Sequence, residues 1–172
     1  MTSMLKTALA AALLAAGAAH AAGVQADLAF GETLSHGTVA GEEHAGVLGF
    51  NLGYRFDNNL AVQFVSFDQL HLFRNFLADE STARYGFDRF LGVQGVGYLP
   101  LNDSFELLGG LGIGTSKLNN GFVADPDRSN TDALLTAGVQ WKVARHFNIG
   151  FDVNYLTKTE VSTATLRTQW AF

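Results

Sequence analysis

Residues Phe147–Tyr155 read FNIGFDVNY, with a large apolar side chain at every second position. This period of two is the period of a β-strand and places all five of those side chains on one face. The other face carries Asn148, Gly150, Asp152 and Asn154. The water-facing side of a soluble sheet usually carries scattered Lys and Glu residues, whereas this face has a single charge. The segment therefore predicts a strand of a membrane β-barrel, with its apolar face toward lipid.

The same alternation recurs along the chain after residue 22. Including Phe147–Thr157, eight strands are predicted, at Val24–Leu34, Val47–Phe56, Leu60–Phe67, Phe90–Leu99, Phe105–Ser116, Ala133–Val143, Phe147–Thr157 and Ser162–Phe172. Eight is the smallest even number that closes a membrane barrel, and closure leaves no backbone group unpaired in lipid. The facing of Phe90–Leu99 is the least determined, because Gly92, Gly95 and Gly97 interrupt its pattern. The fold class is an all-β, antiparallel, up-and-down transmembrane barrel.

The connections between these strands alternate in length. Residues 57–59, 100–104 and 144–146 are predicted tight turns, and residues 35–46, 68–89 and 117–132 are predicted long loops. The connection 158–161 is short although it belongs to the long set. Membrane barrels have short periplasmic turns and longer outer loops, so the N-terminus is predicted to lie in the periplasm. Aromatic residues gather near the short turns, as in an interfacial girdle: Tyr54, Phe56, Tyr98, Phe105, Trp141, Phe147, Trp170 and Phe172.

Residues 1–21 have the three parts of a secretory signal peptide. Lys6 gives a positive start, an Ala/Leu run follows, and Ala19-His20-Ala21 supplies small residues around a cleavage site. The apolar run is shorter than the roughly 20 residues that a membrane-spanning helix needs. The chain is thus predicted to consist of a cleaved signal peptide, residues 1–21, and one barrel domain, residues 22–172.

The composition excludes several classes of protein. The chain has 48% hydrophobic but only 16% charged residues, which argues against disorder. With no cysteine, it has neither a disulfide framework nor a thiolate metal site. The formal net charge of -5 argues against a nucleic-acid partner. No residue pattern indicates a cofactor or a fixed metal site.

Six charges are predicted to face the interior of the barrel: Asp27, Arg55, Glu106, Lys142, Asp152 and Arg167. Centring the 117–132 loop near Ala124 places Glu106 opposite Lys142. Centring the last loop near residues 159–160 places Asp152 opposite Arg167, while Asp27 and Arg55 lie diagonally across the first hairpin. Charges in a narrow lumen need partners, so an internal ion-pair network is expected. Gly110, Gly112 and Gly114 face inward too and are expected to leave room for long side chains from across the lumen.

The chain resembles the OmpA-like family of small outer-membrane β-barrels. The signal peptide carries this resemblance together with NLGYRFDNNLAVQF (51–64), GVQGVGYLPLNDSFELLGGLGIG (92–114), NIGFDVNY (148–155) and LRTQWAF (166–172). It implies location in the outer membrane and a C-terminal assembly signal at Leu166, Trp170 and Phe172. It also implies passage with periplasmic chaperones, recognition by the barrel-assembly machinery, and contact with outer-membrane lipid and lipopolysaccharide. The peptidoglycan-binding domain of larger relatives does not follow the last strand, so cell-wall anchoring is not expected.

The favoured function is non-enzymatic: envelope integrity, or surface interaction through the outer loops, with the lumen closed by ion pairs. One alternative is a narrow channel for ions or small solutes. A second is a lipid A-modifying enzyme, since the loops carry Ser35, His36, His44, His71 and Ser81. Adjacent Ser35 and His36 point apart in an extended chain and do not define a nucleophile with its base.

Two further features of the outer loops have open interpretations. The carboxylates Glu42, Glu43, Asp79, Glu80, Asp125, Asp127 and Asp132 are expected to be solvated, with divalent-cation binding as the alternative. The apolar segment Leu70–Leu77 is predicted to extend a strand, to fold as a short helix, or to contact a partner.

Overall fold

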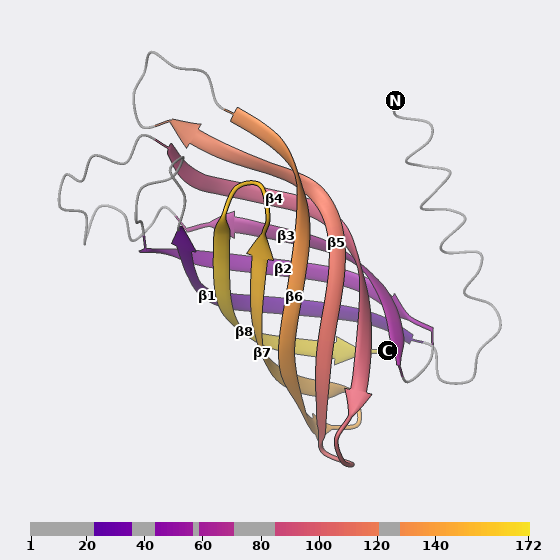
Figure 1. The fold of residues 1–172 in the computed structure, drawn as a ribbon. Coiled ribbons are helices and arrows are strands. Elements are labelled where there is room, and N and C mark those ends of the chain that lie inside the picture. The colour runs from indigo at the N-terminus through magenta and orange to yellow at the C-terminus, as the bar shows by residue number, and fades with distance from the viewer. Residues whose placement is uncertain (1–22, 36–43, 57–58, 71–84, 121–127) are drawn as a thin grey trace.

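The computed structural model describes residues 23–35, 44–56, 59–70, 85–120 and 128–172, and it forms a closed eight-stranded barrel (Figure 1). Each strand pairs antiparallel with its neighbours in sequence, and β1 pairs with β8 to close the sheet. The strands are β1 (Gly23–Ser35), β2 (His44–Arg55), β3 (Leu60–Gln69), β4 (Tyr85–Pro100), β5 (Phe105–Asn120), β6 (Arg128–Ala144), β7 (Phe147–Leu156) and β8 (Val161–Ala171). The predicted fold class, strand number and strand order are confirmed.

The two ends of the barrel differ, and we name them by their connections. The short-turn end carries the connections β2–β3, β4–β5 and β6–β7, together with the start of β1 and the end of β8. There the Phe172 amide donates to the Val24 carbonyl at 2.9 Å. The long-loop end carries the other four connections. Figure 1 shows β4, β5 and β6 as the long strands of the barrel.

The outer face of the barrel between its ends is apolar. Its most exposed side chains in the middle of a strand are Leu111, 70% exposed, and Ile113, 64% exposed. Aromatic pairs lie at the short-turn end, with ring centroids 5.4 Å apart for Tyr54–Phe56 and for Phe147–Trp170. Phe105 stacks with Trp141 in the same zone. Tyr98 departs from the predicted girdle, because it points into the barrel and is buried.

The polarity of the two faces reverses at the long-loop end. Polar side chains face outward there, including Arg89, Lys117 and Thr131, while large apolar side chains face inward. The buried apolar cluster is Val47, Val65, Phe67, Phe87, Phe90, Leu134, Leu156 and Val161. The expectation of a polar interior throughout is therefore wrong at this end. A strand that extends beyond lipid meets water on its outer face, so its apolar side chains pack inward as in a soluble protein.

This reversal explains why three strands extend well beyond their predicted bounds at the long-loop end. β4 begins at Tyr85 rather than Phe90, β5 continues to Asn120, and β6 begins at Arg128 rather than Ala133. Outward polar residues in these extensions, such as Arg89, Lys117 and Thr131, do not match the pattern of a lipid-facing strand. The predicted outward face of Phe147–Tyr155 and the predicted inward face of Gly110, Gly112 and Gly114 are confirmed. In β4, Phe90, Gly92, Gln94, Val96 and Tyr98 alternate inward, which settles its facing.

Several expectations fall outside the described residues. They are the signal peptide 1–21, the loop acids apart from Asp132, and the segment Leu70–Leu77 beyond its first residue. Within the described ranges, no helix has the length and apolar character to cross a membrane.

The lipid-facing position of Leu111 leads to a test. Leu111→Arg is expected to lower the free energy of unfolding by about 2–4 kcal/mol, the cost of Arg at the middle of a lipid-facing strand. Leu101→Arg is the matched control, because Leu101 is 55% exposed but lies in a short turn. Urea unfolding in lipid vesicles measures both variants. Equal effects of the two substitutions would contradict the placement of the apolar belt.

Candidate functional site

The first group of lumen charges lies near the short-turn end, where Glu106 accepts from two cations. Lys142 Nζ lies 2.6 Å from Glu106 Oε1, and Arg55 Nη2 lies 3.2 Å from the same oxygen. Arg55 Nη1 is 3.3 Å from Glu106 Oε2, which makes a two-point contact. The guanidinium of Arg55 also lies 3.9 Å from the centre of the Tyr98 ring. Two positive charges thus share one buried carboxylate.

The predicted opposition of Glu106 and Lys142 is wrong in register, although the two side chains meet. Glu106 is directly opposite Gln140, and Lys142 lies two residues further along β6. The long Lys142 side chain spans this diagonal. Arg55 of β2 reaches across the lumen to β5 and does not pair with Asp27.

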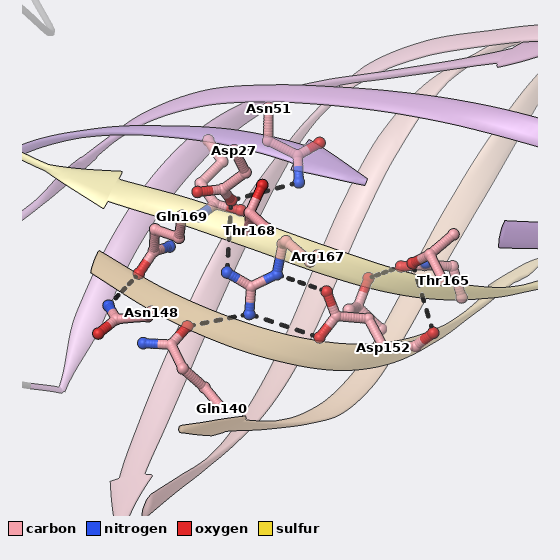
Figure 2. A network of polar contacts seen from close by, with 12 residues as sticks. Asp27, Asn51, Gln140, Asn148, Asp152, Thr165, Arg167, Thr168 and Gln169 are labelled. Carbon is pink, nitrogen blue, oxygen red and sulfur yellow. Dashed lines mark hydrogen bonds and ion pairs between the residues drawn. The ribbon is translucent and has the colours of Figure 1, made fainter. Parts of the chain in front are cut away.

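The second group is centred on Arg167 in the middle of the lumen (Figure 2). Arg167 Nε donates to Asp152 Oδ2 at 2.6 Å, and Arg167 Nη1 lies 3.6 Å from Asp27 Oδ2. All three side chains are buried, with Asp27 1% and Arg167 3% exposed. The predicted register is again two residues off, since Asp152 is opposite Thr165. This group holds two carboxylates and one guanidinium.

Gln140 connects the two groups. Its Nε2 lies 3.4 Å from Glu106 Oε2, and its Oε1 accepts from Arg167 Nη2 at 3.0 Å. The Glu106 group has an excess of positive formal charge, and the Arg167 group has an excess of negative formal charge. Their opposite excesses lie along one lumen, so each group partly offsets the other through Coulomb attraction.

A belt of neutral hydrogen bonds crosses the same region. Tyr98 donates to Gln25, Gln63 to the Tyr98 oxygen, and Gln94 to Gln63, over 3.0–3.4 Å. The Thr136 hydroxyl lies 3.0 Å from Gln94 Oε1 and 2.8 Å from Asn154 Oδ1. These side chains come from strands that are distant in sequence and fill the barrel from several sides. The void among them is about 10 Å³, which is room for about one water molecule.

Glycines make space for this filling, but not for side chains from across the lumen as predicted. Gly110 and Gly112 lie against Gln94, and Gly114 lies against the Phe90 ring, both on the adjacent strand β4. Gly138 and Gly150 flank the Asp152–Arg167 pair in the same way. The signal for Gly138 and Gly150 was present in the sequence as small residues on the inward face, yet their neighbours depend on the register.

Asp132 is not the solvated loop carboxylate that the sequence suggested. It is 1% exposed in β6, and its Oδ1 accepts from the Lys158 and Thr159 amides at 2.5 and 3.0 Å. Its Oδ2 bonds the Ser116 and Thr159 hydroxyls. Asp132 therefore anchors the short β7–β8 turn, in which Glu160 adopts a φ of 56°.

The side chains of the candidate enzyme residues all lie outside the part of the chain that the structure describes. His36, His71 and Ser81 lie outside the described ranges, and the side chains of Ser35 and His44 are not described either. In the part of the chain that the structure covers, no three His, Asp or Glu side chains cluster as metal ligands would. Leu166, Trp170 and Phe172 all face outward near the end of the chain.

Comparison with known proteins gives a family and a set of similar folds. The family model for the outer membrane protein beta-barrel domain matches residues 5–171. No curated protein matches the chain.

Three solved structures are similar over most of the chain. Ail, the attachment invasion locus protein of Yersinia pestis, is 22% identical, with a TM-score of 0.53 over 88% of this chain and 97% of that one. The N-terminal β-barrel domain of Pseudomonas aeruginosa OprF is 13% identical, with a TM-score of 0.59 over 87% and 97%. Neisserial surface protein A is 17% identical, with a TM-score of 0.57 over 88% and 97%. At these identities the likeness shows the fold.

The buried Arg167 leads to a second test. Arg167→Leu leaves Asp27 and Asp152 buried without their cation and is expected to cost about 3–5 kcal/mol of unfolding free energy. Adding Asp27→Asn and Asp152→Asn to Arg167→Leu removes the stranded charges, so part of that loss should return. Lys158→Gln, in the exposed β7–β8 turn, is the charge-matched control. Urea titration in vesicles measures all three, and a loss below about 1 kcal/mol for Arg167→Leu would refute the role of Arg167.

The tight fit at Gly138 leads to a third test. A Cβ at this position would meet the Asp152 carboxylate and would lie 2.7 Å from the Phe151 carbonyl oxygen. Gly138→Ala is therefore expected to destabilise the barrel by about 1–3 kcal/mol, as overpacking does. Gly109→Ala is the control, because nothing lies within 4 Å of its added Cβ. Thermal unfolding in detergent compares the pair, and equal midpoints would show that Gly138 is not tightly packed.

Proposed function

Because this chain belongs to the family of outer membrane protein β-barrel domains, we propose that it is a closed, non-enzymatic barrel that presents its long-loop end at the cell surface. The polarity reversal is the observation that carries this proposal. β4, β5 and β6 continue past the apolar belt with polar side chains outward and large apolar side chains inward. We call this part the collar, comprising residues 85–90, 114–120 and 128–134.

The collar is suited to holding loops in place. An apolar interior stabilises the strands where lipid no longer supports them. Asp132 fixes the β7–β8 turn on the same rim through main-chain and hydroxyl contacts. Binding residues are commonly found on loops that a rigid scaffold positions. By the usual asymmetry of these barrels, the long-loop end faces outside the cell.

The proposed closure of the lumen has three layers. The ion pairs of Glu106 lie nearest the short turns, the Arg167 group and the hydrogen-bond belt occupy the middle, and the apolar cluster lies under the collar. An eight-stranded barrel is just wide enough for its own side chains to fill. The void of about 10 Å³ in the middle supports closure over a steady pore.

Assembly and lipid contacts are proposed in line with the resemblance. The outward apolar residues Leu166, Trp170 and Phe172 serve as the C-terminal signal for the barrel-assembly machinery after transit with periplasmic chaperones. The apolar belt contacts outer-membrane lipid, and the collar rises among the sugars of lipopolysaccharide.

The closed-lumen proposal predicts no steady conductance in planar lipid bilayers. The purified full chain should insert without ohmic current, because charged and neutral side chains fill the lumen across its width. Steady conductance that Lys142→Gln or Arg167→Gln abolishes would favour the narrow channel instead. Insertion is checked separately by protection of the barrel from protease in vesicles of the same lipid.

An experiment in cells distinguishes a role in surface interaction from a role in envelope integrity. Variants in which residues 36–43, 71–84 or 121–127 are replaced by short linkers leave the described strands intact. If the proposal holds, adherence of expressing cells to other cells falls while sensitivity to large antibiotics stays unchanged. Increased antibiotic sensitivity with unchanged adherence would assign an envelope role. Altered lipid A that depends on Ser35 and His36 would assign an enzyme.

A further inference from the structure

A second cavity lies at the short-turn end of the barrel and is separate from the collar. Its volume is about 480 Å³, within the roughly 300–1,000 Å³ typical of small-molecule sites. It opens toward the aqueous side and is lined mostly by polar residues. The charged residues that line it are Arg55, Asp103, Glu106, Lys142 and Arg145, and His146 lies on its rim.

Basic side chains outnumber acidic side chains in the lining of this vestibule. Three basic side chains line it against two acidic ones, although the whole chain has a formal net charge of -5. The Glu106 carboxylate already accepts from Lys142, Arg55 and Gln140, and the residue is 1% exposed. Asp103 is the other acid, and it lies exposed in the β4–β5 turn. Lys142 and Arg145 therefore retain donors that these two acidic side chains do not use.

Two basic side chains in the vestibule are accessible to a ligand. The Lys142 side chain is 37% exposed although its ammonium lies 2.6 Å from Glu106. An ammonium has three donors, and the contact with Glu106 uses one of them. Arg145 is exposed in the β6–β7 turn at the rim. Walls of low dielectric around a positive cleft concentrate its field on an entering anion.

The vestibule ends blindly within the barrel. Beneath it, Arg55 covers the ring of Tyr98, and Tyr98 begins the hydrogen-bond belt. The void among the side chains of that belt is about 10 Å³, too small for anything larger than about one water molecule. A ligand that enters from the short-turn side would be held there and would not pass through.

From this cavity and its charges, we propose that the vestibule binds one small oxyanion of the phosphate or sulfate class. Lys142 and Arg145 donate to the oxyanion, and Arg55 contributes its positive charge from the wall. The site faces the periplasm if the long loops face outside, so its ligand would come from that compartment.

Calorimetric titration of inorganic phosphate into the full chain tests this proposal. The protein is refolded in a maltoside detergent, which carries no phosphate, and sodium chloride holds the ionic strength constant. One saturable site is expected, and sulfate should compete for it. Lys142→Gln and Arg145→Gln are each expected to weaken binding about tenfold, since each removes one charge-assisted contact. Lys158→Gln, at the opposite end of the barrel, should bind phosphate as the unchanged protein does.

The outcomes separate the proposal from nonspecific attraction. Absence of saturable binding overturns it, as does binding that persists in both Lys142→Gln and Arg145→Gln. If Lys158→Gln loses as much phosphate affinity as Lys142→Gln and Arg145→Gln do, phosphate is attracted to overall charge, and the proposal is overturned. If Lys142→Gln does not refold, Arg145→Gln alone decides, because Arg145 lies in an exposed turn. The result is independent of whether the collar binds a surface partner.

Discussion

The absence of hydrogen-bonding partners in lipid is the constraint on which this structure depends. A peptide group that faces hydrocarbon must bond to another peptide group, so every strand needs a neighbour on both sides. The pairing of β1 with β8 meets this need and turns the sheet into a tube. The outward apolar rows and the inward polar rows follow, because one face of that tube meets lipid and the other is enclosed.

Closure with eight strands has a second consequence, which is a lumen that side chains must fill. Polar groups on the enclosed face cannot all reach water, so they bond to one another. Arg167 forms ion pairs with Asp27 and Asp152 and donates a hydrogen bond to Gln140, while Glu106 accepts from several donors. Glycine at positions 138 and 150 lets these long side chains lie close to the neighbouring strands. The interior is thus a set of mutually dependent contacts.

Where a strand extends beyond the membrane, the face that carries its apolar side chains changes from the outer to the inner one. Where β4, β5 and β6 pass the lipid belt, water replaces hydrocarbon outside, and the stable arrangement is an apolar interior. Phe90 in β4 therefore points inward only a few residues from Leu91 and Val93, which face lipid. The two ends of one barrel consequently differ in their lining: large apolar side chains at the long-loop end and a vestibule lined mostly by polar residues at the other.

The sequence by itself determined the class of fold, the number of strands and six of the charges that face inward. These follow from local alternation, as in Phe147–Tyr155, because a strand alternates its side chains whatever its neighbours are. Only the tertiary structure decided the partners of those charges. The register of each hairpin depends on where its loop is centred, which local alternation does not fix, and Glu106 lies opposite Gln140 rather than Lys142. Contacts across the lumen, such as Arg55 with Glu106, and the buried place of Asp132 depend on closure of the barrel, which no local pattern records.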